Sequence, residues 1–321
     1  MQRRSALAVL TAAGLPWPAR AAGFPSRAIK ILVPFTGGSG SDTGARVYGE
    51  ILGKLVGQPV VVENRPGASG QIAIQALKQA PPDGHTLLLA TNSPLTVNPV
   101  VMKNLPYDPV KDFRPVIGLN RGPVGFAVRA DSPHKTMADL VNAAKRDRRP
   151  LAAGNYSAGY ELLNAWLGNL AGLEMTHVAY KGAAPMLTDV MGGQLELGTA
   201  DMGGAMMQLH KENRVRMLAI TADKRSATLP EVPTMKESGY AEFQSWIWAA
   251  LYVRAETPDD ITNRLAEVMQ KVLASDAAKA YLANNPTLEP MAFSPEEMRR
   301  FQLAEYERFR RIAEAAGLQP R

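Results

Sequence analysis

Short apolar runs and amphipathic segments alternate along the first third of the chain. Three apolar runs predict buried strands, at Ile29–Pro34, Val60–Val62 and Thr86–Ala90. Helical spacing separates the first two runs, with apolar residues at Ala45, Tyr48, Ile51, Leu52 and Leu55. Gly57 is the predicted end of this helix, and Ser69 is the predicted N-cap of a second helix through Ala80. This order of strand, helix and strand predicts a parallel sheet covered by helices on both faces.

The second half of the chain repeats this order. Four further strands are predicted, at Leu151–Ala153, Met175–Val178, Leu195–Leu197 and Met217–Thr221. Thr136 and Asp139 have the spacing of a capping box, which opens a helix through Lys145. Ser294, followed by a proline and two glutamates, predicts the start of a long amphipathic helix near the C-terminus.

One octapeptide pattern occurs twice. Phe126–Pro133 reads FAVRADSP and Leu251–Pro258 reads LYVRAETP, and a helical segment follows each copy. About 125 residues separate the copies, which is too far for a solenoid repeat. We interpret them as two crossover strands between lobes; a coincidence between two strand-to-helix junctions is the alternative. The crossings predict a discontinuous first lobe, 23–125 and 249–321, and a second lobe, 126–248.

The N-terminus has the pattern of an export signal. Arg3 and Arg4 precede a short apolar stretch, Ala6–Leu15, and Ala19–Ala21 resembles an A-x-A cleavage site. The apolar stretch is much shorter than the roughly 20 residues that span a bilayer. We therefore predict a signal peptide at residues 1–22 and a periplasmic location, with Sec and twin-arginine export both left open.

Composition narrows the classes of protein. The chain has 321 residues and no cysteine, which excludes disulfide scaffolds, thiolate metal sites and thiol nucleophiles. Its net charge is +6, but the one dense basic run, at residues 145–149, lacks the interleaved aromatic residues of a nucleic-acid surface. We expect no nucleic-acid partner.

The loop after the first strand carries the clearest chemistry. Residues 34–42, PFTGGSGSD, join a strand to a helix, and such a loop points backbone N–H groups at an anion. A dinucleotide fingerprint is the alternative, because Gly38 and Gly40 are followed by Thr43, and Glu63 lies about twenty residues further on. Export without a cofactor argues against that alternative, so no cofactor is expected.

Other enzyme signatures are missing from the sequence. It contains no G-x-S-x-G nucleophile elbow, no phosphate loop and no zinc-binding H-E-x-x-H helix. Its four histidines are scattered without the spacing of metal ligands. We expect neither an enzyme nor a metal site. Trp246 and Trp248, near the second crossing, are typical of core residues.

Several long motifs occur in the order found in one family. They are GQPVVVENRPGA at 57–68, LPYDPVKDF at 105–113, YKGAAP at 180–185 with Asp189 and Gly192–Gln194, and LPEVPT at 229–234. With these motifs the sequence resembles the periplasmic substrate-binding proteins of tripartite tricarboxylate transporters, the Bug-type receptors. The resemblance implies an α/β type II periplasmic-binding-protein fold, in which two crossover strands join two α/β lobes around a ligand cleft.

The resemblance also implies a site for a small carboxylate, bound by backbone amides of the first loop and of a matching loop in the second lobe, 154–160. Asp201 corresponds to an acidic position of the family, displaced by one residue. From the residues themselves, Gly38 would allow close backbone approach, Ser39 and Ser41 would donate, and Asp42 would brace the loop or serve purely as a helix cap. The predicted ligand-binding residues are Thr36, Gly37, Gly38, Ser39, Ser41, Asp42, Thr91, Asn92, Asn155, Tyr156, Ser157, Tyr160 and Asp201.

Two tyrosines direct the prediction of ligand type. Tyr156 and Tyr160 stand where the family has small residues, and they favour a flat or apolar carboxylate, such as an aromatic acid, over citrate. The alternative is that both side chains pack against the second lobe. We expect a monomer that delivers its ligand to membrane subunits of a tripartite tricarboxylate-type transporter. An exported NAD(P)-dependent dehydrogenase and a ligand sensor with a signalling partner are the alternatives.

Overall fold

The computed structural model describes residues 23–320, so the predicted signal peptide lies outside the described residues. The first lobe is built on β1 (Ile29–Val33), β2 (Val60–Asn64) and β3 (Thr86–Thr91). Its helices are α1 (Gly40–Val56), α2 (Gln71–Gln79), α8 (Asp259–Ala274) and α9 (Asp276–Asn284). β1 lies between β2 and β3 and is parallel to both. Alternate residues of β1 enter opposite layers: Ile31 packs with α1 and α8, and Leu32 packs with α2.

The second lobe repeats this layered arrangement. Its strands are β5 (Leu151–Asn155), β6 (Met175–Ala179), β7 (Leu197–Asp201) and β8 (Val215–Ile220). Its helices are α4 (Met137–Arg146), α5 (Ala158–Ala171), α6 (Ala183–Met191) and α7 (Ala205–Lys211). β5 is parallel to both β6 and β7. The prediction of a strand at Leu195–Leu197 was wrong in its bounds, because the amides of Gln194 and Leu195 both still donate to the Asp189 carbonyl in a turn.

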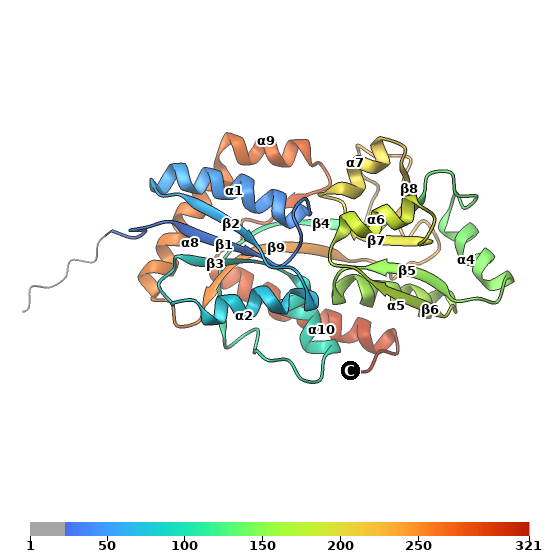
Figure 1. Ribbon diagram of the computed structural model, residues 1–321, viewed down its shortest axis with the longest axis horizontal. Coiled ribbons are helices and arrows are strands. Elements are labelled where there is room, and N and C mark those ends of the chain that lie inside the picture. Colours follow the sequence, from blue (N-terminus) through green and yellow to red (C-terminus); the bar gives the residue numbers. More distant parts are fainter. Residues whose placement is uncertain (1–22, 321) are drawn as a thin grey trace, which may run out of the picture.

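Two long strands run between the lobes (Figure 1). β4 (Phe113–Arg129) and β9 (Trp246–Arg254) are antiparallel to each other. β9 also pairs with β3 in the first lobe, whereas the far end of β4 pairs with β7 and β8 in the second. The two predicted crossover strands are therefore confirmed. The sheet is mixed at the crossing rather than wholly parallel, because the chain returns in the opposite direction.

Local capping signals in the sequence were mostly reliable. Gly57 ends α1 with a left-handed φ of 68°, and the capping box predicted at Thr136 is present. Ser294 caps α10 as predicted, and it also forms a capping box with Glu297. The prediction that Ser69 caps α2 was wrong. Ser69 lies in the short 3-10 turn η1 (Ala68–Gly70) with a φ of 51°, and Gly70 is the N-cap.

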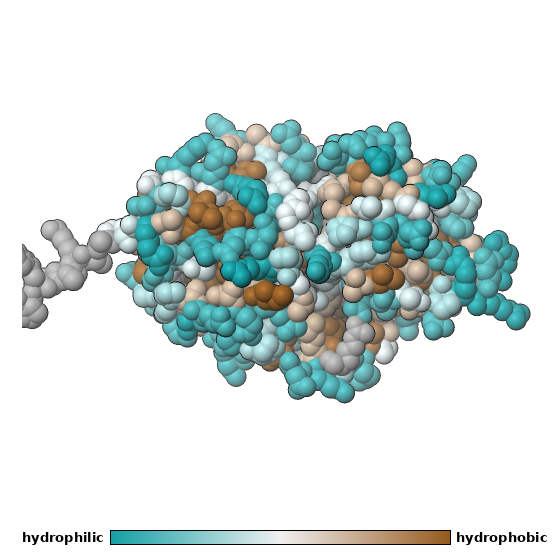
Figure 2. Space-filling model, viewed as in Figure 1, coloured by the Kyte–Doolittle hydropathy of each residue, from teal (hydrophilic) through white to brown (hydrophobic). Residues whose placement is uncertain are grey.

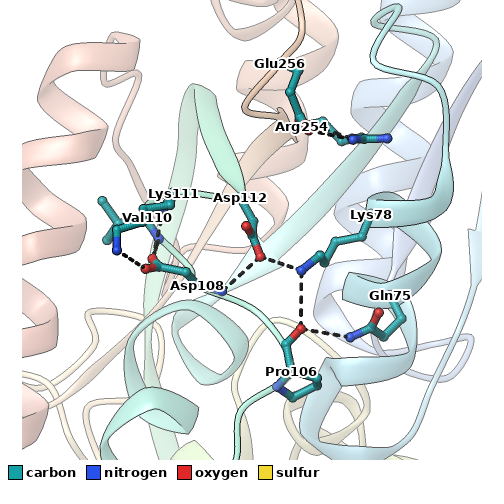
Figure 3. Close-up of polar contacts among 9 residues, drawn as sticks. All are labelled: Gln75, Lys78, Pro106, Asp108, Val110, Lys111, Asp112, Arg254 and Glu256. Carbon is teal, nitrogen blue, oxygen red and sulfur yellow. Dashed lines mark hydrogen bonds and ion pairs between the residues drawn. The ribbon is translucent and has the colours of Figure 1, made fainter.

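Short elements complete the first lobe. The π-helical turn η2 (Ser93–Val97) and α3 (Asn98–Val101) follow β3, and β10 (Glu289–Pro290) pairs with β4. The LPYDPVKDF motif at 105–113 anchors the start of β4 to α2 (Figure 3). Lys78 Nζ donates to Asp112 Oδ2 at 2.6 Å, and Lys78 and Gln75 both donate to the Pro106 carbonyl. This motif therefore has a structural role.

The C-terminal helix α10 (Pro295–Ala315) bridges the two lobes (Figure 1). Its first half places Met298 in the core beside Trp248, and its second half places Phe309 and Ile312 in the core of the second lobe. Among residues 23–320, no helix has both the length and the apolar character needed to cross a membrane.

Candidate ligand-binding site

A cavity of about 40 Å³ lies where the two lobes meet. Its walls come from the start of α1, the end of β3, the crossing strands β4 and β9, the start of α5 and the end of β7. Apolar side chains supply part of the lining: Phe35, Leu89, Leu119, Met202, Ile247 and Leu288. On the face shown in Figure 2, the surface between the lobes is pale, between the hydrophilic and hydrophobic extremes. Small-molecule binding sites commonly form in clefts between rigid structural elements.

Six of the predicted site residues line this cavity: Ser41, Thr91, Asn92, Ser157, Tyr160 and Asp201. The other seven do not: Thr36, Gly37, Gly38, Ser39, Asp42, Asn155 and Tyr156. The two groups divide by position in their loops. The six that line the cavity lie at strand ends and in the first turns of helices, whereas four of the other seven, residues 36–39, belong to the first glycine loop.

Much of the hydrogen-bonding capacity of the first loop is used internally. The amide of Gly38 donates to Asp42 Oδ2 at 3.0 Å, and the amide of Ser39 donates to the Thr36 carbonyl. Ser39 is the N-cap of α1, and its hydroxyl accepts from the Asp42 amide at 3.2 Å. Gly40 and Ser41, in the first turn of α1, line the cavity, and their amides have no acceptor within residues 23–320.

Asp42 therefore braces the loop and does not face the cavity. Its carboxylate also accepts from Asn64 Nδ2 at 2.9 Å and pairs with Arg46. Burial alone would raise the pKa of Asp42, but Arg46, the Gly38 amide and Asn64 together hold it below its usual value. The carboxylate is thus ionised at neutral pH and bound to its own loop.

Three buried polar atoms at the cavity have no partner within residues 23–320. They are Thr91 Oγ1, Asn92 Oδ1 and Trp248 Nε1. Thr91 and Asn92 are 1% exposed, and Trp248 is 0% exposed. Because buried polar groups are almost always hydrogen-bonded, three such atoms around one cavity indicate a polar ligand. Trp248 packs in the core beside Met298, as the sequence predicted, and it also lines the cavity. Sequence reasoning missed that its indole N–H has no partner within residues 23–320.

Asp201 lies at the end of β7 and reaches the cavity from the second lobe. Its Oδ2 accepts from the hydroxyl of Tyr156 at 2.7 Å and of Tyr160 at 3.4 Å, and its Oδ1 accepts from the Gly203 amide at 3.1 Å. Burial raises the pKa of Asp201 despite these donors. Among the described residues that line the cavity, there is no lysine, arginine or histidine to neutralise it.

The two tyrosines are braces for Asp201. Tyr156 packs edge-on against Phe35, with ring centroids 5.6 Å apart, and does not line the cavity. Tyr160 lines it, and its hydroxyl oxygen also accepts from the Asp201 amide at 3.1 Å. Burial raises the pKa of both hydroxyls far above the usual value, so both stay neutral. Both hydroxyls are therefore engaged with Asp201.

The first turn of α5 is capped from the opposite lobe. Its N-cap residue, Ser157, makes no capping bond of its own. The amide of Ala158 instead donates to Ser69 Oγ at 3.1 Å, and the amide of Gly159 donates to Ser93 Oγ at 3.2 Å. Asn98 Nδ2 donates to the Ser69 carbonyl and supports its left-handed backbone. The second-lobe loop thus uses these two amides to bind first-lobe hydroxyls.

Two glycines permit the lobes to touch. A methyl group on Gly40 would lie 2.4 Å from Asp201 Oδ1, and one on Gly182 would lie 2.0 Å from Thr36 Oγ1. Each pair joins residues of opposite lobes. Together with the serine contacts, they define a closed arrangement in which the cavity is enclosed on both sides.

Two lobes, two crossing strands and a cavity lined by unpartnered polar groups define a solute-binding protein of the type II periplasmic class. The model of the tripartite tricarboxylate transporter family receptor matches residues 45–318. The chain belongs to this family, and the resemblance seen in its motifs is confirmed. The family is one of periplasmic binding proteins.

Individual relatives agree with this assignment. A UPF0065 protein of Agrobacterium vitis, from the TAR-I ttuE-ttuC' intergenic region, is 33% identical over 99% of this chain and 92% of its own length. The periplasmic binding protein BugD superposes with a TM-score of 0.87 at 27% identity, covering 93% of this chain and all of BugD. The structure of an R. palustris protein with adipate superposes with a TM-score of 0.87 at 32% identity, covering 93% of this chain and all of that protein. The structure of a Rhodopseudomonas palustris protein with bound malate superposes with a TM-score of 0.84 at 26% identity, covering 90% of this chain and 99% of that protein.

Proposed function

We propose that this protein captures a small carboxylate in the interlobe cavity and delivers it to membrane subunits of a tripartite tricarboxylate-type transporter. The observation that carries this proposal is the set of donors at the cavity: the Gly40 and Ser41 amides at the start of α1 and the indole N–H of Trp248. A helix N-terminus favours an anion, and a buried unpartnered N–H favours an acceptor such as a carboxylate oxygen. The adipate and malate complexes of similar proteins support the same ligand class.

The lining favours one carboxylate on a small body over citrate. Citrate brings about three negative charges at neutral pH. The described residues that line the cavity provide no cationic side chain, and they include a second acidic group, Asp201. The apolar and aromatic walls, including Phe35, Tyr160 and Trp248, would contact the rest of the ligand. An aromatic acid stays a prediction, and it would require the lobes to close less far than they do here.

The remaining parts of the proposal concern cell biology. The protein is exported by the predicted signal peptide at residues 1–22, acts as a monomer in the periplasm and performs no catalysis. A dehydrogenase is disfavoured because the Gly38 amide is bound to Asp42, and Glu63 pairs with Lys30 at 2.7 Å. A ligand sensor is the second candidate, and loss of ligand uptake on gene deletion would distinguish transport from sensing.

A ligand screen tests the function. Thermal shift against di- and tricarboxylates, aromatic acids and amino acids should reveal a stabilising ligand, since binding to the folded state raises its melting temperature. Calorimetry should then show that Trp248→Phe, which keeps an aromatic ring but removes the N–H, weakens binding about 5- to 30-fold. Trp166→Phe is the matched control, because Trp166 Nε1 is also buried without a partner but lies away from the cavity.

The outcomes separate the proposal from its alternatives. Stabilisation by NAD(P) without any response to carboxylates would contradict a carboxylate receptor. Equal affinity of the wild type and Trp248→Phe for the best ligand would show that the indole N–H of Trp248 does not bind the ligand, and this donor would have to be withdrawn from the site.

A further inference from the structure

The cavity contains a buried carboxyl group, that of Asp201, beside which the described residues of its walls place no cationic side chain. Asp201 receives hydrogen bonds from two neutral hydroxyls and one amide, and no cationic side chain of the described residues lines the cavity. A carboxylate held away from water normally has a counter-charge, because its desolvation is costly. A ligand that carried only negative charge would increase that cost.

The residues that line the cavity supply both hydrogen-bond donors and hydrogen-bond acceptors. The donor group is the Gly40 and Ser41 amides with the indole N–H of Trp248. The acceptor group is the Asp201 carboxylate with Asn92 Oδ1, which has no donor within residues 23–320. A simple carboxylate has only acceptor atoms at neutral pH, so it leaves Asn92 Oδ1 without a donor and brings no positive charge to Asp201. A ligand that satisfies both groups must also donate.

The two groups are adjacent where α1 meets β7. A methyl group on Gly40 would lie 2.4 Å from Asp201 Oδ1, so this carboxylate stands directly beside the first turn of α1. An α-amino acid carries its carboxylate and its ammonium on one carbon, which gives the same close spacing of acceptor and donor. An ammonium group has three N–H donors and a positive charge, and both suit Asp201.

We propose, on the basis of the proposed carboxylate-binding function, that this receptor selects a small α-amino acid, with the ammonium group on Asp201 and the carboxylate at the start of α1. Tyr156 and Tyr160 position the Asp201 side chain for this contact. Asp201 is then a specificity-determining residue, which rejects the same carbon skeleton without its amino group by leaving a buried charge unpaired.

The test compares pairs of ligands that differ only in the amino group. The pairs are L-alanine and propionate, L-aspartate and succinate, and L-phenylalanine and 3-phenylpropionate, measured by calorimetry at pH 7 on the wild-type protein. In every pair that binds, the amino acid should have a dissociation constant lower by about 30-fold or more. The pair with the largest signal also identifies the body of the ligand.

Two variants assign the preference to Asp201. Asp201→Asn should reduce the preference within a pair to about threefold or less, because the charge is removed while the side chain keeps its size. Asp189→Asn is the matched control, since Asp189 also accepts a tyrosine hydroxyl at 2.7 Å but lies outside the cavity. It should keep the full preference. A change in melting temperature would show whether either variant is unfolded.

The proposal is overturned if the compound without the amino group binds as tightly as its amino acid, or tighter, in the wild-type protein. Tighter binding of that compound at pH 5 than at pH 8 would indicate instead that Asp201 is protonated and donates to the ligand. Both results leave the carboxylate receptor intact. The receptor function itself fails only if no carboxylate of any kind stabilises the protein.

Discussion

Gly40→Ala tests whether ligand binding requires the lobes to approach as closely as they do here. The added methyl group would lie 2.4 Å from Asp201 Oδ1 and 3.3 Å from its Cγ. Real Cβ atoms stay at least 3.0 Å from other atoms, so the lobes must separate by about 0.6 Å at this point. Asp201 cannot easily turn aside, because Tyr156, Tyr160 and Gly203 hold both of its oxygens.

The added methyl group destabilises only the closed state, in which Gly40 contacts Asp201. Overpacking of this size costs about 1–3 kcal/mol, which weakens binding about 5- to 150-fold. Folding of each lobe should not suffer, because alanine is a better helix former than glycine by up to about 1 kcal/mol. The expected signature is therefore weaker ligand binding with an undiminished melting temperature, measured by calorimetry and thermal denaturation on the same samples.

Gly192→Ala supplies the matched control. Residue 192 ends α6, and its added methyl group would approach no atom closer than 3.4 Å. This variant should keep the affinity of the wild type. If Gly40→Ala also binds the best ligand with wild-type affinity, the contact between α1 and Asp201 is not part of the bound state, and the closure argument fails.

Three further predictions concern the contacts between the lobes and the brace of the first loop. Replacing both Ser69 and Ser93 with alanine should weaken ligand binding about 2- to 30-fold, because the α5 amides lose their caps only in the closed state. Ser275→Ala, which removes an ordinary cap of α9, should lower stability without changing affinity. Small-angle scattering should show contraction when the best ligand is added, and an unchanged radius at saturation would count against hinge closure. Asp42→Asn should lower the free energy of unfolding by about 1–3 kcal/mol at pH 7. Because the folded-state pKa of Asp42 is lowered, this deficit should persist above about pH 5 and vanish as the pH falls through that pKa; a deficit independent of pH would refute the ionic role.

Signals that act within one turn or strand could be read from the sequence. The capping boxes at Thr136 and Ser294 satisfy backbone N–H groups at the start of their own helices. Gly57 ends α1 in a left-handed backbone conformation that residues with a side chain rarely adopt. The repeated octapeptide located both crossing strands, because each copy combines a buried strand with the start of a helix. Family motifs then predicted the class of fold and the polar residues after β3.

The interlobe contacts required the tertiary structure. Ser69 has the sequence context of a helix cap, yet its hydroxyl caps α5 of the other lobe, and no local pattern encodes a partner 89 residues away. Trp248 resembles any buried tryptophan, and only the tertiary structure places it at the cavity with its indole N–H unpaired. The pKa of Asp201 is raised by its burial, which folding creates, although the hydroxyls and the amide that donate to it act in the opposite direction. The sequence alone therefore determined the strands, the caps and the family, whereas the packing of the two lobes decided which polar atoms remain unpaired for a ligand.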